Sequence, residues 1–430
     1  MITCYNSFME FKIKKEVLAS GLTLLTIPMP TESVTALLLV RVGSRDESKA
    51  INGLSHFVEH MVFKGTEKWP TTQAVNRVID SVGGVFNAFT GQEYTGFWVK
   101  VAKKHLPLGL EFLKQIIFKC RLPKEELERE RGVILEEIKM RDDEPMTLVA
   151  DKFVSQVYSA TQLGRDVIGT SENIKRIQRI EFVKHLKKWY QPSNMVLAVA
   201  GPASAKGTAA EVEKIFSQKA NNVINQPEKL KFKQDKPQTQ VINKKIEQAH
   251  FCLGVRTFGR VHPDRYVLAV LTTILGGNTS SRLWNEIREI RGLAYYVRSS
   301  TDSFRETGYL ITQAGCATDK LAETIKLTVK EYEKISQESV KDKELKLAKE
   351  YLKGRLALAF EDSQIVAGEY GESLLLEGKV RTLAEIYDQL DQVQVDRVQQ
   401  LAGKIFQASQ LNLTIVGPFK NQEKFARLLL

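Results

Sequence analysis

The segment Leu54–Lys64, Leu-Ser-His-Phe-Val-Glu-His-Met-Val-Phe-Lys, carries two histidines four positions apart. On an α-helix, His56 and His60 would lie one above the other on the same face. Two imidazoles in this arrangement can fill two corners of a tetrahedral zinc site. Glu59 would lie close to the same face, where a carboxylate can take a proton from a water molecule. The segment therefore predicts a metal-binding helix.

The other residues of this segment indicate that the helix is buried. They are apolar almost all round: Leu54, Phe57, Val58, Met61, Val62 and Phe63. A helix of this kind lies in a core, where unpaired polar groups are costly. A metal ion would supply partners; the alternative is two core histidines satisfied by hydrogen bonds. The metal is favoured because the chain has only six histidines and two of them fall at ligand spacing around a glutamate.

Composition places the chain among globular proteins. The chain is 43% hydrophobic, and its length of 430 residues is enough for two to four domains. The formal net charge is +11. The lysines are scattered or fall in runs such as Lys341–Lys353, where acidic residues are interspersed and a solvated helix face is indicated. We therefore expect no nucleic-acid partner.

The cysteines and the chain start point to a cytoplasmic protein. Cys4, Cys120, Cys252 and Cys316 lie far apart and form no Cys-x-x-Cys pair, which is typical of reduced thiols. The first residues lack the basic and apolar regions of a signal peptide, and no apolar stretch is long enough to span a membrane. We expect a cytoplasmic location and no membrane partner.

The second half of the chain repeats features of the first. Val40-Arg41 recurs as Val255-Arg256, 215 positions later, and Met195–Pro202 recurs as Leu411–Pro418, 216 positions later. Two further matches lie at nearly the same offset: Thr95-Gly96-Phe97 with Thr307-Gly308-Tyr309, and Glu126-Leu127-Glu128 with Glu344-Leu345-Lys346. Matches in one order at nearly one offset predict two halves of the same fold.

Each half reads as strand, helices, strands, helices and strand, which predicts an α+β class with mixed or antiparallel sheets covered by helices. Within the first half, Glu172–Lys188 is expected to form one helix. A polar, proline-containing stretch suggests a linker. The predicted domains are a catalytic metal-binding half at 1–220, a linker at 221–239 and a second half at 240–430. The second half has no metal motif where the repeat would place one, at Leu268–Leu271, so catalysis is assigned to the first half.

A third metal ligand is expected from the glutamate-rich segment that follows. Most glutamates there belong to a solvated face. Glu137, however, is flanked by Val133, Ile134 and Ile138, which predicts that it points toward the packed side. Glu130 lies two helical turns earlier on the same face.

Three segments, Gly53–Thr66, Gly84–Gly96 and Glu130–Met140, resemble the pitrilysin-type inverzincins, the metallopeptidases with a His-x-x-Glu-His helix. The chain looks most like the branch of bacterial and mitochondrial processing peptidases. The resemblance covers nearly the whole chain, including its two halves, and implies the LuxS/MPP-like metallohydrolase fold.

The resemblance also implies roles for individual residues. His56, His60 and Glu137 would bind one zinc ion per chain, with Glu136 as a competitor for the third position. Glu59 would be the general base and Glu130 a carboxylate that supports the ligands. By the same resemblance, Asn87 and Ala88 lie on an edge strand that binds the substrate backbone as an added strand. An ordinary edge strand is the alternative.

The second half carries an arginine and a tyrosine that also match this family, Arg288 and Tyr295. The resemblance implies that they grip the peptide near the scissile bond, with the tyrosine donating to the developing oxyanion. The alternatives are a surface arginine and a core tyrosine. Since larger relatives hold four such halves in one chain, the resemblance implies a homodimer whose sites are completed in trans, or a heterodimer with a metal-less homologous subunit.

The implied function is that of a zinc endopeptidase that cleaves unfolded peptides or presequence-like segments inside a clam-shaped chamber. The alternative is a non-catalytic core or scaffold subunit of the same fold in a larger complex. Such a subunit would be expected to lose its histidines and glutamates, whereas this chain keeps the whole set.

Overall fold

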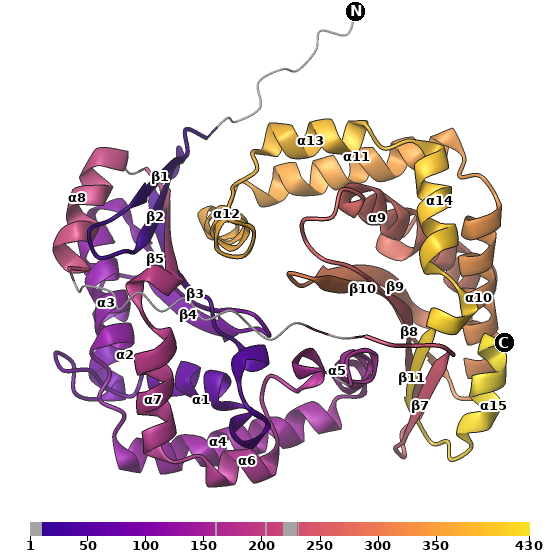
Figure 1. Cartoon of the computed structure of the whole chain (residues 1–430), viewed down its shortest axis with the longest axis horizontal. Helices are drawn as coiled ribbons and strands as arrows, with labels where there is room; N and C mark the ends of the chain where they lie inside the picture. Colours follow the sequence, from indigo (N-terminus) through magenta and orange to yellow (C-terminus); the bar gives the residue numbers. More distant parts are fainter. Residues whose placement is uncertain (1–10, 160, 203, 218–229, 231) are drawn as a thin grey trace, which may run out of the picture. The chain divides into compact units, whose positions relative to one another are not determined.

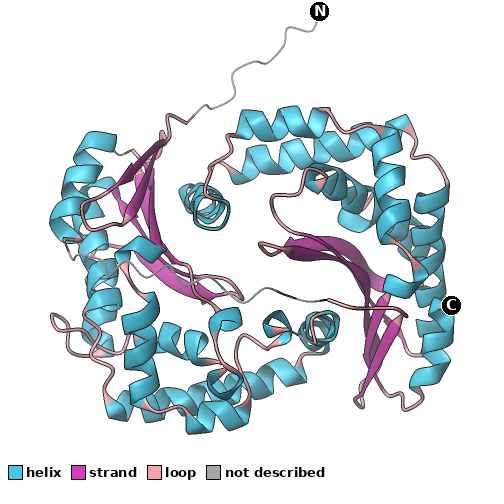
Figure 2. Ribbon diagram, in the orientation of Figure 1, coloured by secondary structure: helices cyan, strands magenta, loops and turns pink. Residues whose placement is uncertain are grey.

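The computed structural model describes residues 11–159, 161–202, 204–217, 230 and 232–430. Groups of strands are separated by runs of helices along these ranges (Figures 1 and 2). Most of the predicted linker, namely 221–229 and 231, lies outside the described residues, as does Cys4. Strand β7 begins at Gln238, inside the range predicted as linker.

The first sheet has six strands in the order β1-β2-β6-β3-β5-β4. Their bounds are Lys14–Val17, Thr23–Pro28, Met195–Gly201, Ser33–Val40, Thr95–Ala102 and Val85–Thr90, in that order. Strands β2 and β6 are parallel, and all other pairs are antiparallel. Strand β4 is therefore an edge strand, and among the described strands none pairs with its outer edge.

The second sheet repeats this topology in the order β7-β11-β8-β10-β9. Its strands are Gln238–Asn243, Asn412–Gly417, Gln248–Phe258, Thr307–Ala317 and Ala294–Ser303, in that order. Strands β7 and β11 are parallel, as are β2 and β6. The predicted α+β fold, with two similar halves and mixed sheets, is confirmed.

Helices pack on both sheets around buried apolar clusters, one in each half of the chain, and a further cluster lies between α5 and the second sheet. In the first half they are α1 Leu54–Met61, α2 Thr72–Asp80, α3 Leu106–Phe118, α4 Lys124–Asp143, α5 Pro145–Val157, α6 Ser171–Arg176, α7 Arg179–Trp189 and α8 Ala205–Ile215. In the second half they are α9 Arg265–Thr272, α10 Leu321–Gln337, α11 Asp342–Ala359, α12 Ser363–Glu377, α13 Leu383–Asp391, α14 Val395–Ile405 and α15 Gln422–Ala426. Two π-helical turns, Thr273–Gly277 and Trp284–Ile290, follow α9.

The helix expected over Glu172–Lys188 is two helices, α6 and α7, so this prediction is wrong. Ile177 leaves the helical region with ψ 125°. The next residue, Gln178, starts α7 through a reciprocal cap in which its backbone N–H donates to the Glu181 side chain. A local cap therefore overrides the continuous helical periodicity.

The described residues form two compact units, and each unit includes a segment from the other half of the chain. Unit 1 holds 11–138, 165–217 without 203, and 357–384; unit 2 holds 139–164 without 160, 230, 232–356 and 385–430. Helix α12 packs on β3 and β6 in unit 1, while α5 packs on the equivalent strands β8 and β11 in unit 2. The exchange is therefore reciprocal.

Polar contacts fasten both exchanged helices. Ser363 at the start of α12 lies 2.9 Å from Thr35 of β3, hydroxyl to hydroxyl. The Gln313 side chain of β10 donates to the carbonyl of Met146 in α5. The packing thus departs from the predicted division into 1–220 and 240–430. The chain crosses between units inside the continuous helices α4 and α11, where no loop signals a boundary.

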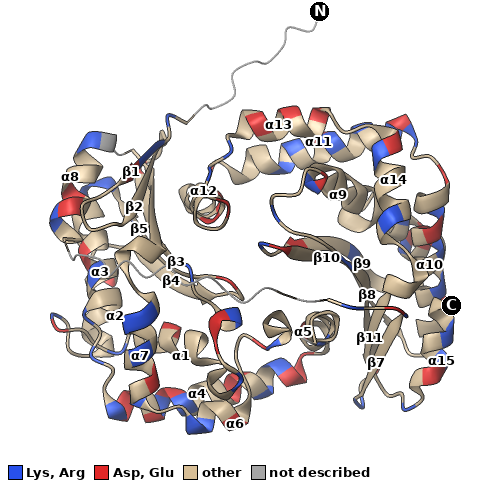
Figure 3. Cartoon of the chain, in the orientation of Figure 1, with Lys and Arg blue, Asp and Glu red and all other residues tan. Residues whose placement is uncertain are grey.

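The surface carries charges of both signs. Helices α4 and α11 show acidic and basic residues side by side (Figure 3). Among the described helices, none is both long and apolar enough to cross a membrane.

Candidate metal centre

Helix α1 has a buried side and a partly open side. The buried side consists of Leu54, Phe57, Val58 and Met61. On the other side, the His56 and His60 side chains are 12% and 21% exposed. The helix follows Gly53, whose φ of 101° is left-handed, and a Cβ there would lie 2.7 Å from the Ile168 carbonyl oxygen. Only glycine fits this entry into the helix.

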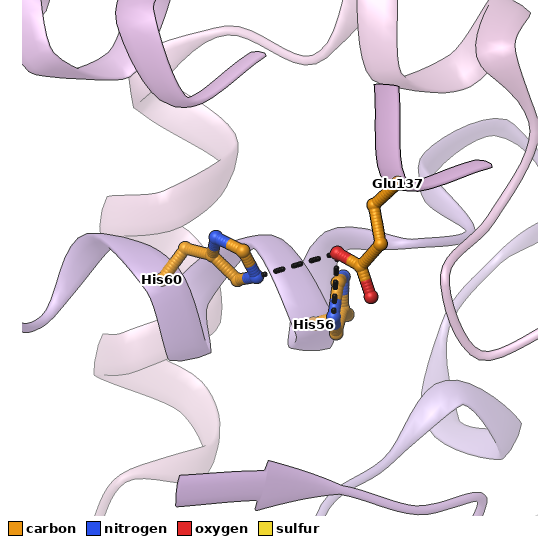
Figure 4. Close-up of side chains that lie close together, drawn as sticks. All are labelled: His56, His60 and Glu137. Carbon is orange, nitrogen blue, oxygen red and sulfur yellow. Dashed lines mark ion pairs between the residues drawn. The ribbon is translucent and has the colours of Figure 1, made fainter. Parts of the chain in front are cut away.

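The structure brings His56, His60 and Glu137 together (Figure 4). The Oε2 atom of Glu137 lies 3.7 Å from Nε2 of each histidine, and all three candidate ligand atoms lie within 4.8 Å of one another. Tetrahedral zinc with nitrogen and oxygen ligands separates its donor atoms by about 3.3–3.6 Å. The donor set therefore fits zinc with small side-chain adjustments, and it leaves a coordination position open.

The two neighbouring glutamates of α4 differ in their surroundings. Glu137 is half-buried and belongs to the cluster, whereas Glu136 is exposed and lies outside it. The predicted flanks are only partly correct: Ile134 is buried, but Val133 is 47% exposed. The turn of the helix, rather than a fully apolar stripe, directs Glu137 toward α1.

Glu130 supports His60 from behind. Its Oε2 lies 3.0 Å from Nδ1 of His60, and its Oε1 lies 2.6 Å from Nζ of Lys64. Burial alone would raise the pKa of Glu130, but the hydrogen bonds from His60 and Lys64 outweigh it and lower the pKa. The ionised carboxylate accepts from Nδ1–H, so the lone pair of His60 resides on Nε2, which faces Glu137.

Glu59 lies beside the cluster and is held by Thr90 of β4. The Thr90 hydroxyl donates to Oε2 of Glu59 over 2.6 Å. Burial raises the pKa of Glu59, while the hydrogen bond from Thr90 opposes this shift. A carboxylate with a raised pKa that still has one free oxygen is suited to exchange protons.

A second buried carboxylate, Glu47, caps the N-terminus of α1. It accepts hydrogen bonds from the backbone N–H of Gly53 at 2.8 Å and of Ser55 at 2.5 Å, and from the Asn52 side chain at 3.0 Å. Burial raises the pKa of Glu47 to about 7, and these hydrogen bonds oppose the shift. A carboxylate at this end also interacts favourably with the helix dipole.

The predicted substrate contacts Asn87 and Ala88 lie on β4, the edge strand that packs against α1. Asn87 is exposed and Ala88 is half-buried, because successive side chains alternate between the two faces. The Oδ1 atom of Asn87 accepts from the backbone N–H of Ala88 over 2.8 Å. The backbone N–H of Ala88 is therefore already hydrogen-bonded to the side chain of the preceding residue.

Arg288 and Tyr295 lie together in unit 2. The Arg288 guanidinium donates to the Tyr295 carbonyl over 2.5 Å and stands 4.3 Å from the ring of Trp284. Tyr295 is 74% exposed as a residue, so it is not the core tyrosine of the alternative interpretation. The other predicted residues, His56, His60, Glu59, Glu130 and Glu137, belong to unit 1.

Sequence reasoning missed Lys64, Thr90 and Glu47. Lys64 follows His60 by four positions and could have been placed on its helix face from spacing alone. The side chains of Thr90 and Ala88 are expected on the same face of the strand, but no local sequence pattern predicts that the Thr90 hydroxyl contacts Glu59. Glu47 caps the helix from a preceding loop, outside the positions at which capping residues are recognised.

Two family models match the chain. The first, described as insulinase (peptidase family M16), matches residues 23–171. The second, described as the peptidase M16 inactive domain, matches residues 176–352. The first match includes all the candidate ligands, and the second includes Arg288 and Tyr295.

Named relatives cover almost the whole chain. An uncharacterized zinc protease of Mycobacterium tuberculosis is 33% identical over 97% of this chain and 95% of its own length. The uncharacterized zinc protease YmxG of Bacillus subtilis is 34% identical over 95% of this chain and 99% of its own length.

Solved structures show the same architecture. A protease from Helicobacter pylori superposes with a TM-score of 0.88 at 25% identity, over 95% of this chain and all of that one. A chain of complex III2 from Candida albicans superposes with a TM-score of 0.83 at 18% identity, over 97% and 99% of the two chains, which is a likeness of fold. With relatives at one-third identity along nearly its full length, the chain belongs to the M16 peptidase family, the insulinase family, as the processing-peptidase resemblance predicted.

Proposed function

We propose that this protein is a zinc endopeptidase that cleaves unfolded peptides or presequence-like segments. The observation that carries the proposal is the cluster of His56, His60 and Glu137, which has the donor types and spacing of a zinc site and has Glu59 beside it. The names of the relatives, which call them zinc proteases, agree with this assignment.

In the proposed reaction, a bound zinc ion would supply Lewis acidity to the scissile carbonyl and to the attacking water. Glu59 takes the proton of that water on Oε1, the oxygen that Thr90 leaves free, and passes it to the leaving amide nitrogen. Glu130 keeps the His60 ring in the tautomer and orientation that aim Nε2 at the site.

Substrate binding is assigned to the free edge of β4. An extended peptide can add to such an edge through backbone hydrogen bonds, with little demand on its side chains. Asn87 must release the Ala88 amide before a peptide can bond to it. This mode of binding selects segments that are not already folded, in keeping with the proposed substrates.

Arg288 and Tyr295 are proposed to act on the bound peptide, and the working unit is proposed to be a homodimer. A heterodimer with a metal-less homologous subunit is the alternative. Support comes from the exposure of Tyr295 and from the hydrogen bond that ties Arg288 to it.

A non-catalytic scaffold subunit is the competing function, and the fold likeness to a complex III chain is the observation in its favour. The complete set of His56, His60, Glu59 and Glu137 argues against it.

The proposal is tested by removing and restoring metal. The purified chain should contain about one zinc per chain and cleave a library of quenched fluorescent peptides. A chelator should abolish cleavage, and added zinc should restore it. A metal-free chain that cleaves equally well, or a zinc-loaded chain that cleaves no peptide, would overturn the assignment.

A further inference from the structure

We propose that Thr90 is a positioning residue that links peptide docking on β4 to proton transfer by Glu59. This inference rests on the proposed function and adds to it a residue with two contacts, one to the base and one to the substrate backbone. Neither the metal ligands nor the arginine–tyrosine pair supplies such a link.

The first contact is made by the Thr90 side chain. Side chains of Phe86, Ala88 and Thr90 share one face of β4, and β4 packs against α1. At the end of this row, the Thr90 hydroxyl reaches Oε2 of Glu59 over 2.6 Å. A hydroxyl donates only one hydrogen, so this bond engages one carboxylate oxygen and leaves Oε1 as the proton acceptor.

The second contact is available from the Thr90 backbone. The N–H of Gly91 donates to the carbonyl of Tyr94 over 2.9 Å, so this pair is bonded across the β4–β5 ladder. Because bonded and non-bonded pairs alternate in an antiparallel ladder, Thr90 belongs to a non-bonded pair with Thr95. Its N–H and C=O therefore face the free edge, as do those of Ala88 and Phe86.

One residue thus presents its backbone to an incoming strand and its side chain to the base. A peptide that bonds to Thr90 fixes the backbone from which the hydroxyl projects, and thereby fixes Glu59 relative to the scissile bond. A threonine suits this role because its branched side chain has restricted χ1 freedom. The expected consequence is that loss of the hydroxyl impairs turnover while peptide affinity is retained, since the backbone supplies the edge contacts.

The test compares Thr90→Val, which keeps the shape and removes the hydroxyl, with Thr90→Ser, which restores a hydroxyl. Thr301→Val is the matched control, since Thr301 is an exposed threonine on β9, the edge strand that corresponds to β4 in the second sheet. Steady-state kinetics, zinc content, melting temperature and the Kd of an uncleaved peptide for the zinc-free protein are measured for each.

In Thr90→Val, kcat should fall at least about tenfold, which is part of the 10²–10⁴-fold that a positioned base contributes. KM, zinc content, melting temperature and peptide Kd should stay within about twofold of the parent, and Thr90→Ser should recover most of kcat. Thr301→Val should change nothing.

Three results would overturn the inference: a Thr90→Val protein with full kcat, a Thr90→Ser protein as impaired as Thr90→Val, or a loss of kcat that parallels a loss of peptide binding or zinc. Its failure is distinguishable from failure of the proposed function. If the parent cleaves peptides, Glu59→Gln does not, and Thr90→Val does, only the link through Thr90 is wrong. If the parent cleaves no peptide, the proposed function and the role of Thr90 are both wrong, because there is no hydrolysis for Glu59 to assist.

Discussion

Nδ1 of His60 and Oε2 of Glu130 lie 3.0 Å apart, so the carboxylate holds the imidazole with Nε2 aimed at Glu137. We predict that Glu130→Gln lowers zinc affinity by about 10- to 100-fold, the usual cost of losing such a supporting carboxylate. Competition with a chromogenic chelator measures the affinity. Glu128→Gln, on the exposed side of the same helix, is the control. An unchanged zinc Kd in Glu130→Gln would remove this role.

The third ligand is tested by a pair of adjacent substitutions. Glu137→Gln should lose bound zinc because its Oε2 is 3.7 Å from both histidine nitrogens. Glu136→Gln should keep zinc and activity because Glu136 is exposed and outside the cluster. Metal analysis after dialysis decides between them, and the reverse pattern would make Glu136 the ligand.

His185 is predicted to limit stability at acid pH. It is 5% exposed in α7, and burial, with a smaller effect of the Lys188 charge, lowers its pKa to about 3. As pH falls below 6.5, His185 binds a proton in the unfolded chain but stays neutral in the folded chain. Stability is therefore lost from about pH 6.5 downward, by up to about 1.4 kcal/mol per pH unit from this group.

The measurement is urea unfolding between pH 4 and 8. His185→Phe should show a shallower acid limb than the parent, whatever its stability at pH 8. His105→Phe, at a partly exposed histidine, should keep the parental slope. Equal slopes in all three proteins would mean that His185 is protonated in the folded state.

The sequence predicted those parts of the site that depend on local geometry. His56, Glu59 and His60 lie on one short helix, so their spacing alone determines that they share a face. Glu137 comes from a different helix, and its selection over Glu136 relied on a local apolar pattern that holds at Ile134 but fails at Val133. The cluster nevertheless forms, because the helical turn sets its direction.

Features that depend on packing between distant segments could not be predicted. The Thr90 hydroxyl meets Glu59, and Glu47 meets the start of α1, only after strand and loop pack against that helix. The reciprocal exchange of α5 and α12 had no signal either, since the crossing that precedes each of these two helices lies within a continuous helix, α4 or α11. The repeat predicted the matching topology of the sheets but not the helix that each receives.

The arginine–tyrosine pair and the dimer are tested by complementation. Glu59→Gln and Tyr295→Phe subunits should each be nearly inactive alone. If each site combines Glu59 of one chain with Tyr295 of its partner, each mixed dimer holds one intact site and one damaged site. Relative to the same amount of parent dimer, activity should therefore approach half of the fraction of dimers that are mixed. Subunits that demonstrably exchange without any recovery would contradict action in trans. A parent that is active only with a metal-less homologue would favour the heterodimer.

In the proposed reaction, Glu59 moves the proton of the attacking water at a site built by His56, His60 and Glu137. The most direct measurement is zinc content and peptide turnover of Glu59→Gln, determined on the same preparation. Glu59→Gln should keep the parental zinc content and lose kcat by at least about 10²-fold, the lower range for general acid–base catalysis. A zinc-loaded Glu59→Gln protein that retains substantial turnover would contradict this role of Glu59.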